Sequence, residues 1–162
     1  MKGKRSRIVR IRGTIFAIVA AVILPTGGLA QRTAPSIAGS YDGTGTNTIT
    51  TAGMSPRAMP TRPGRFVLAP AAAGDVSVTM SGTDGSEPCA LRGRAQGNVV
   101  MMTPGAACTV TGRSTMTVVS GRVTLTGSDL AVDMTMTMQV PGEDGGVMNV
   151  TNHYVFNGRR RP

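Results

Sequence analysis

Aromatic side chains and histidine are scarce in this chain of 162 residues, which has no tryptophan, two tyrosines, three phenylalanines and one histidine, His153. Proteins that bind single-stranded nucleic acid stack bases on aromatic side chains, and outer-membrane barrels carry two aromatic girdles. The shortage argues against both classes. The sequence also has no G-x-S-x-G, H-E-x-x-H or P-loop pattern. We therefore expect a protein that is not an enzyme and that needs no cofactor.

Lysine is missing after Lys4, and the 17 basic residues are unevenly placed. Six of them precede an apolar run at residues 15–24, and small residues follow up to Ala30. A basic start, a short apolar stretch and small residues at the cleavage position are typical of a secretory signal peptide. The run is shorter than the roughly 20 residues that a membrane-spanning helix needs. We expect cleavage after Ala30, export to the periplasm or the extracellular space, and no membrane span.

The formal net charge of +9 is concentrated in this leader. Cleavage would remove six basic residues and no acidic ones, leaving 132 residues with 11 basic and eight acidic side chains, a net charge of +3. A body so close to neutral argues against a nucleic-acid partner. A chain of this length forms one domain, and we expect a monomer. We place the domain at residues 37–158, between a short extension at 31–36 and a basic tail at 159–162.

Threonine, valine, glycine and methionine are abundant, a composition that favours short β-strands separated by turns. At residues 130–140 apolar and polar residues alternate without a break, as in a strand with one buried and one wet face. Further strands are expected at residues 40–51, 65–69, 75–81, 89–96, 99–102, 108–111, 119–125 and 147–156. We predict an all-β fold, a single antiparallel up-and-down barrel of about eight strands, with a β-sandwich as the alternative. A barrel is favoured because closure removes unpaired edges.

Two segments depart from this rhythm. Val119 begins the inward-facing set that continues with Gly121, Val123 and Leu125, but Met116 and Val118 are out of phase with it, which predicts a bulge or bend. Residues 51–64 contain three prolines, which exclude a central strand because proline lacks the donor of the hydrogen-bond ladder. We interpret them as an ordinary surface loop, with a mobile binding loop or lid as the alternative.

Cys89 and Cys108 are the only cysteines, and an exported protein meets an oxidising compartment. A hairpin that turns at Gly97-Asn98 sets them roughly opposite one another, and Pro104-Gly105 would absorb a register slip. We predict a disulfide. The alternatives, a reactive thiol or a metal-binding pair, lack a basic partner or a second pair in the sequence.

Methionine is the one chemically suggestive excess, with 11 residues. A stripe of three shares the phase of the aliphatic residues at 130–140, and we interpret it as lining of the core or of a ligand cavity. The candidate lining residues are Met134, Met136, Met138, Met148, Val132 and Val150. Thioethers also suit Cu(I), so the alternative is a periplasmic copper site made by Met134, Met136, Met138 and His153. His153 is predicted on the opposite face of its strand, where Asp42, Asp133 or Glu143 could pair with it.

Residues 37–46 with their Gly39-Ser40-Tyr41 element, the meander with the two cysteines, and residues 154–159 resemble the small exported calycin-like (lipocalin-like) β-barrel proteins of bacteria. The resemblance implies a Gly-x-aromatic start to the first strand and a near-terminal strand that closes a small barrel. It carries no catalytic residues.

We therefore expect a binding protein that holds a small apolar molecule in a Met/Val-lined barrel, or that binds an exported protein partner through its loops. An inhibitor of an exocellular enzyme is a further alternative, in which residues 51–64 or the tail would insert into the enzyme.

Overall fold

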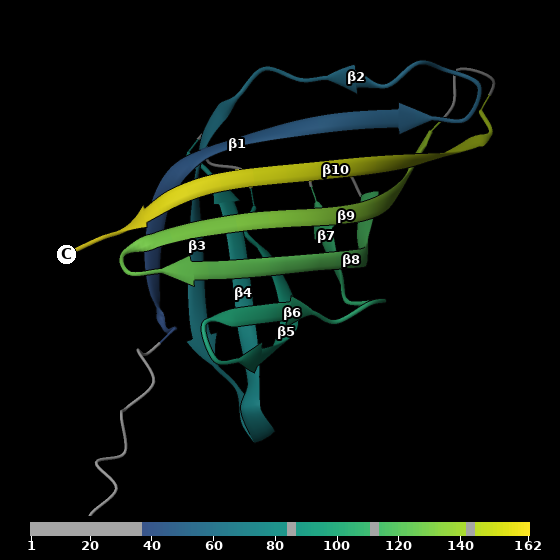
Figure 1. Ribbon diagram of the computed structural model, residues 1–162. Coiled ribbons are helices and arrows are strands. Elements are labelled where there is room, and N and C mark those ends of the chain that lie inside the picture. The colour runs from purple at the N-terminus through teal and green to yellow at the C-terminus, as the bar shows by residue number, and fades with distance from the viewer. Residues whose placement is uncertain (1–36, 84–86, 111–113, 142–144) are drawn as a thin grey trace, which may run out of the picture. The chain divides into compact units, whose positions relative to one another are not determined.

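A computed structural model describes residues 37–83, 87–110, 114–141 and 145–162 (Figure 1). The signal peptide expected at 1–30 and the extension at 31–36 lie outside these residues. The described strands are β1 (Gly39–Thr51), β2 (Arg57–Ala58), β3 (Arg62–Pro70), β4 (Asp75–Gly82), β5 (Cys89–Gln96), β6 (Val99–Met102), β7 (Ala107–Val110), β8 (Ser114–Thr126), β9 (Asp129–Pro141) and β10 (Val147–Arg160), with a 3-10 turn, η1 (Ala72–Gly74), before β4. In this part of the chain we find no helix with the length and apolar character to span a bilayer.

Eight strands close into an antiparallel barrel in the order β1-β10-β9-β8-β6-β5-β4-β3, and β3 pairs with β1 again. The closing ladder joins β1 to β10 from Tyr41↔Arg160 to Thr51↔Val150. Two short strands lie off this path, because β2 pairs with β1 and β7 pairs with β8. The predicted barrel is confirmed, and a sandwich is excluded because the ladder returns to its first strand.

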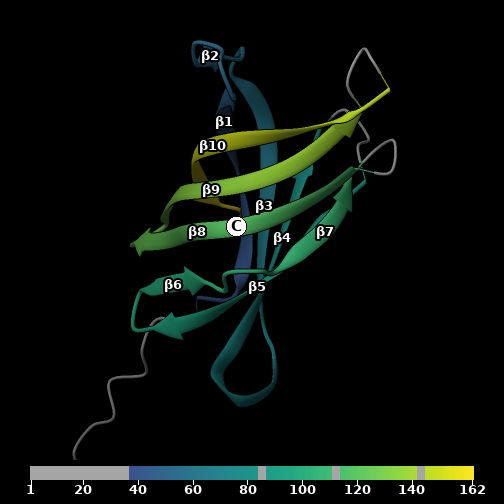
Figure 2. The ribbon, with the colours of Figure 1, turned by 90° about the vertical axis from the view of Figure 1, so that its right-hand side faces the viewer.

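Figures 1 and 2 show β8, β9 and β10 crossing the direction of β3 and β4, while β1 curves from one direction into the other. Gly43 lies in β1 where it is paired with both β3 and β10. A Cβ atom at Gly43 would collide with the backbone of Asn157 and Gly158. Glycine therefore permits the close approach of β1 and β10 that this bend requires.

The core follows from the two-residue alternation of the strands. Residues that face inward are fully buried on several strands, and the largest are Tyr41, Phe66, Phe156, Leu68, Leu91, Leu130, Met134 and Met136. At its centre the Phe66 and Phe156 rings lie 4.6 Å apart between centroids. Burial of this apolar surface is the main contribution to stability at roughly 25 cal/mol per Å².

The irregularity expected near Val119 is a β-bulge, because the register of β8 against β9 shifts between Val118 and Ser120. The predicted bulge is confirmed, but the predicted inward direction of Val119 is wrong. Val118 is buried, whereas Val119 is the extra residue and is 49% exposed. The bulge restores the inward phase for Gly121 and the residues after it.

Residues 51–64 form less of a loop than expected. Arg57–Ala58 pairs with β1 at Thr48 and Ile49, and the N–H of Met59 donates to the carbonyl of Asn47 at 2.7 Å. β3 begins at Arg62, before the predicted residue 65. Proline is tolerated there because residue 63 pairs with β1 only, at the start of the strand.

The C-terminal arginines are part of the barrel rather than a tail that starts at residue 159. β10 continues through Arg160, whose guanidinium lies 5.5 Å from the centre of the buried Tyr41 ring and donates to the Tyr41 hydroxyl at 3.2 Å and to the Ala38 carbonyl. Arg159 pairs with Asp129 at 3.1 Å. These contacts hold the first and last strands together at this end of the barrel, and β10 extends two residues past the boundary expected at 158.

Candidate functional site

A cavity of about 450 Å³ lies at the opposite end of the barrel from Arg160, and we name it the mouth cavity. It lies where β3 and β5 begin and where β4 and β7 end. Its apolar lining includes Met80, Cys89, Val110 and Met116, and its polar lining includes Asn47, Arg62, Glu87 and Tyr154. A volume of this size falls within the usual range of small-molecule sites, roughly 300–1,000 Å³.

The disulfide holds the apolar wall of the mouth cavity together. The Cys89–Cys108 bond has an S–S distance of 2.00 Å and a Cα–Cα distance of 5.4 Å, so the predicted disulfide is confirmed. Cys89 pairs with Met80 on β4, and Cys108 pairs with Met116 on β8. The two methionines are therefore neighbours of the two half-cystines, and the bond fixes both sides of the wall.

The disulfide also lies beyond the point where β5 stops pairing with β6. The hairpin turns at Gly97-Asn98 as expected, but the β5–β6 ladder ends at Gly93↔Met102. Residues 103–106 then lead into β7, with the Gly105 N–H donating to the Val118 carbonyl at 2.8 Å. Beyond that point the cross-link connects β5 to β7.

Tyr154 supplies the largest polar side chain of the mouth cavity. It reaches the cavity from β10, and its ring crosses Gly45 of β1, where a Cβ atom would collide with the phenol. The ring packs 6.1 Å from Phe66 and 6.5 Å from Phe156, measured between centroids. Burial raises the pKa of Tyr154 to about 12, so the phenol is neutral at physiological pH.

The methionine stripe, expected to line either the core or a ligand cavity, is mostly packed core. Met134 and Met136 are fully buried, and Val132 and Val150 are at most 5% exposed. Met138 is partly buried against this core. None of these residues lines the mouth cavity, whose wall is formed by a different set.

Met148 is a separate correction. Its phase along β10 is inward, as predicted, but its side chain is 37% exposed. It pairs with Val140 near the ends of β9 and β10, next to residues 142–144, which lie outside the described part of the chain. The position of a residue in the strand alternation gives the direction of its side chain. The side chain is buried only if other residues pack against it from across the barrel.

The copper alternative requires His153 near the methionine stripe, and the structure separates them. His153 lies on the outer face of β10, as predicted, and its Nε2 is 2.9 Å from Oδ1 of Asp133 on β9. Met134 and Met136 face the core on the other side of the sheet. Asp133 is therefore the partner among the three carboxylates considered, and Glu143 lies outside the described residues.

Asn152 interrupts the apolar inner face of β10, an exception that is visible in the sequence. It is 9% exposed, lies between Ile49 and Met136 in the sheet, and its Oδ1 accepts no hydrogen bond from the described residues. A buried oxygen without a partner costs free energy, roughly 1–3 kcal/mol. It lies one inward position from Tyr154 along β10.

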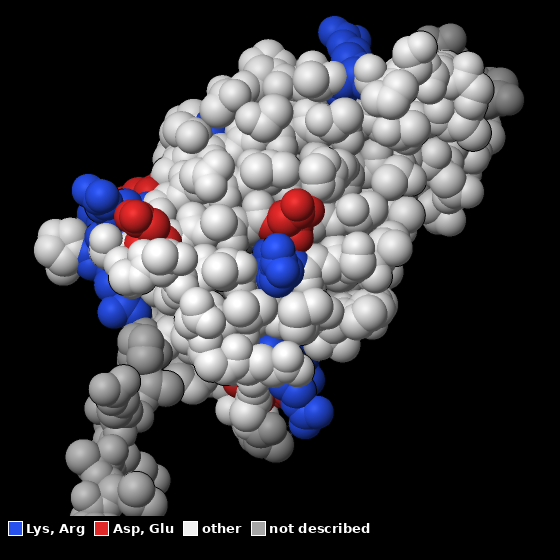
Figure 3. All heavy atoms as spheres, viewed as in Figure 1, with Lys and Arg blue, Asp and Glu red and all other residues white. Residues whose placement is uncertain are grey.

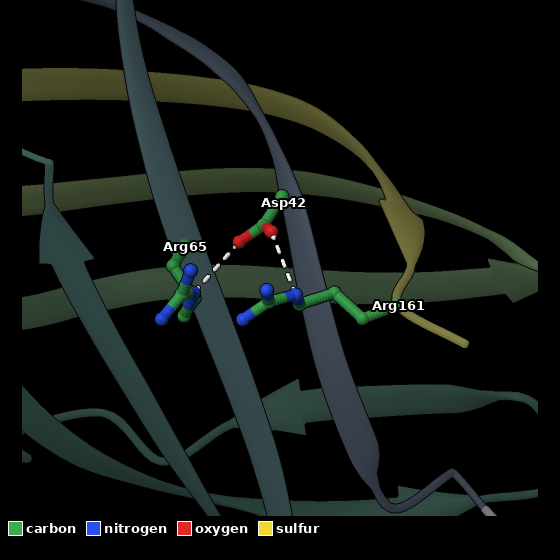
Figure 4. Close-up of polar contacts among 3 residues, drawn as sticks. All are labelled: Asp42, Arg65 and Arg161. Carbon is green, nitrogen blue, oxygen red and sulfur yellow. Dashed lines mark hydrogen bonds and ion pairs between the residues drawn. The ribbon is translucent and has the colours of Figure 1, made fainter.

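A second polar cluster, at the Arg160 end, centres on Asp42. Its carboxylate accepts a hydrogen bond from Arg65 at 2.7 Å and forms an ion pair with Arg161 at 3.1 Å (Figure 4). The hydrogen bond from Arg65, with the charges of both arginines, lowers the pKa of Asp42. Each charge has a partner, so the cluster joins β1, β3 and the C-terminus instead of offering a site.

No protein-family model and no curated protein matches the sequence. Among solved structures the chain is similar to a redesigned β-barrel, at 17% identity and a TM-score of 0.41 over 78% of this chain and 92% of the other. It is also similar to Rv2717c from M. tuberculosis (10% identity, TM-score 0.36, 78% and 93% coverage) and to YwiB from Bacillus subtilis (13%, 0.32, 82% and 99%). Similarities of this size assign no function.

Proposed function

We propose that this chain is a non-catalytic, exported binding protein that holds a small apolar molecule in the mouth cavity. The observation that carries the proposal is the cavity itself. Its wall includes two thioethers, a valine and a disulfide, and its polar groups include a neutral phenol, an amide and the oppositely charged Arg62 and Glu87. Binding sites for small molecules combine a mainly apolar wall with few polar groups in this way. The Gly39-Ser40-Tyr41 start of β1, which packs against Arg160, supports a calycin-like barrel as the scaffold.

The remaining parts of the proposal rest on chemistry and location. Catalysis is disfavoured because His153, the single histidine, is on the outer face and does not line the cavity. Export is supported by the leader pattern of the sequence and by a disulfide, which is typical of oxidising compartments. The face formed by β1, β10, β9 and β8 carries few charges (Figure 3), which disfavours a nucleic-acid partner.

A titration with N-phenyl-1-naphthylamine, an uncharged probe that fluoresces in apolar surroundings, tests the proposal. We expect saturable binding of one probe per chain. Met80→Trp should weaken it by about tenfold, because the indole occupies the cavity. Met101→Trp is the matched control, since Met101 lies on the outside of the barrel and is 43% exposed.

Two results would contradict binding in the mouth cavity. One is the absence of saturable fluorescence with the wild-type chain. The other is equal affinity in Met80→Trp and wild type while the circular dichroism spectra of both are those of a folded β protein.

A further inference from the structure

The two tyrosines of the chain have opposite hydrogen-bonding states. Tyr41, at the Arg160 end, donates to the Ile37 carbonyl at 3.3 Å and accepts from Arg160 at 3.2 Å. Tyr154, in the wall of the mouth cavity, has no hydrogen-bond partner among the residues that the structure describes. A half-buried hydroxyl without a partner inside a cavity is a group that a ligand could satisfy.

The surroundings of this hydroxyl define what such a ligand carries. A phenol has one proton to donate, and Asn47 lies opposite Tyr154 in the β1–β10 register and also lines the cavity. Side chains that face each other across an antiparallel pair are roughly 4.5–5.5 Å apart at Cβ. An oxygen with two lone pairs, as in a carbonyl group, can therefore accept from the phenol with the Asn47 amide beside it.

The same surroundings disfavour an anion. The two charged residues of the lining, Arg62 and Glu87, have opposite signs, and the apolar wall made by Met80, Met116 and Val110 provides no further compensation for a negative charge. The burial that raises the pKa of Tyr154 acts against a phenolate and would act against a carboxylate placed at the same point.

We propose that the ligand of the mouth cavity is an uncharged apolar molecule with a carbonyl oxygen, and that Tyr154 binds it by donating a hydrogen bond to that oxygen. This inference rests on the proposed function, since it assumes that the mouth cavity is occupied. Ketones, esters and amides are the classes that fit. Tyr154 is then the residue that distinguishes these molecules from hydrocarbons of the same shape.

Propiophenone and propylbenzene provide the test, because they differ only in a carbonyl that replaces a methylene group. Each is titrated as a competitor of N-phenyl-1-naphthylamine against the wild-type chain, Tyr154→Phe and Tyr41→Phe. Removal of the Tyr154 hydroxyl should weaken propiophenone by about fivefold, the value of one neutral hydrogen bond. Propylbenzene should compete equally well with wild type and Tyr154→Phe, and Tyr41→Phe should leave both affinities unchanged.

The possible failures are distinguishable. If the probe binds but Tyr154→Phe weakens both competitors equally, or neither, the carbonyl assignment is overturned and the binding function stands. If Tyr41→Phe produces the same selective loss, the hydroxyl of Tyr154 has no special role and the assignment is also overturned. If the probe does not bind the wild-type chain, the proposed function itself fails and this inference fails with it.

Discussion

Replacing both cysteines by alanine is expected to lower the free energy of unfolding by about 3 kcal/mol. The bond closes a loop with a sequence separation of 19, and the chain-entropy model gives a value of this size for such a loop. The cross-link also connects β5 to β7 beyond the end of the β5–β6 ladder, so its loss removes a covalent link between these strands. Urea denaturation of Cys89→Ala/Cys108→Ala, followed by circular dichroism, measures the change.

The wild-type chain in the presence of dithiothreitol is the control for this variant, because it loses the bond and keeps both sulfur atoms. It should unfold at nearly the same urea concentration as the double variant. Equal stability of the oxidised wild type and the double variant would show that the disulfide does not stabilise the barrel.

Phe156→Ala should lower the free energy of unfolding by about 3–5 kcal/mol, the usual cost of truncating a fully buried phenylalanine. Phe156 is completely buried at the centre of the barrel, with the Phe66 ring 4.6 Å away between centroids. The chain has only five aromatic side chains, so little else can occupy the space that is left. Urea denaturation again measures the change.

Val155→Ala is the matched control, because Val155 is the preceding residue and points outward, 37% exposed. Its cost should be within about 0.5 kcal/mol. A loss of less than about 1 kcal/mol for Phe156→Ala would contradict a barrel packed around the aromatic residues.

The barrel was predictable from the sequence because the patterns that indicate its strands and turns lie within short segments of the chain. Period-two alternation at residues 130–140 specifies a buried face, and the cysteine positions around Gly97-Asn98 specify a hairpin. The direction of Val119 was not predictable, because a bulge adds one residue without changing the apolar character of its neighbours. The break in alternation predicted the bulge but did not show whether Val118 or Val119 was the extra residue.

The residues that line the mouth cavity could not be predicted from the sequence, because the lining depends on which strands face one another across the barrel. A Cβ atom at Gly121 would lie 2.9 Å from the side chains of Met102 and Met134, so glycine makes room for these methionines to fill the centre. Met80 and Met116 line the cavity instead, on strands that are far apart in the sequence. One signal could have pointed to Met80 and Met116. Each of them pairs with a half-cystine on the neighbouring strand, so the predicted disulfide marks the wall on which both lie.

Nuclear magnetic resonance of protein labelled with ¹³C at the methionine methyl groups tests the central claim most directly. On titration with N-phenyl-1-naphthylamine, the account predicts that the Met80 and Met116 signals, which report the mouth cavity, move the most. The exposed Met54 and Met101 should not move. Unchanged Met80 and Met116 signals, or shifts confined to Met54 and Met101, would contradict a binding site inside this end of the barrel.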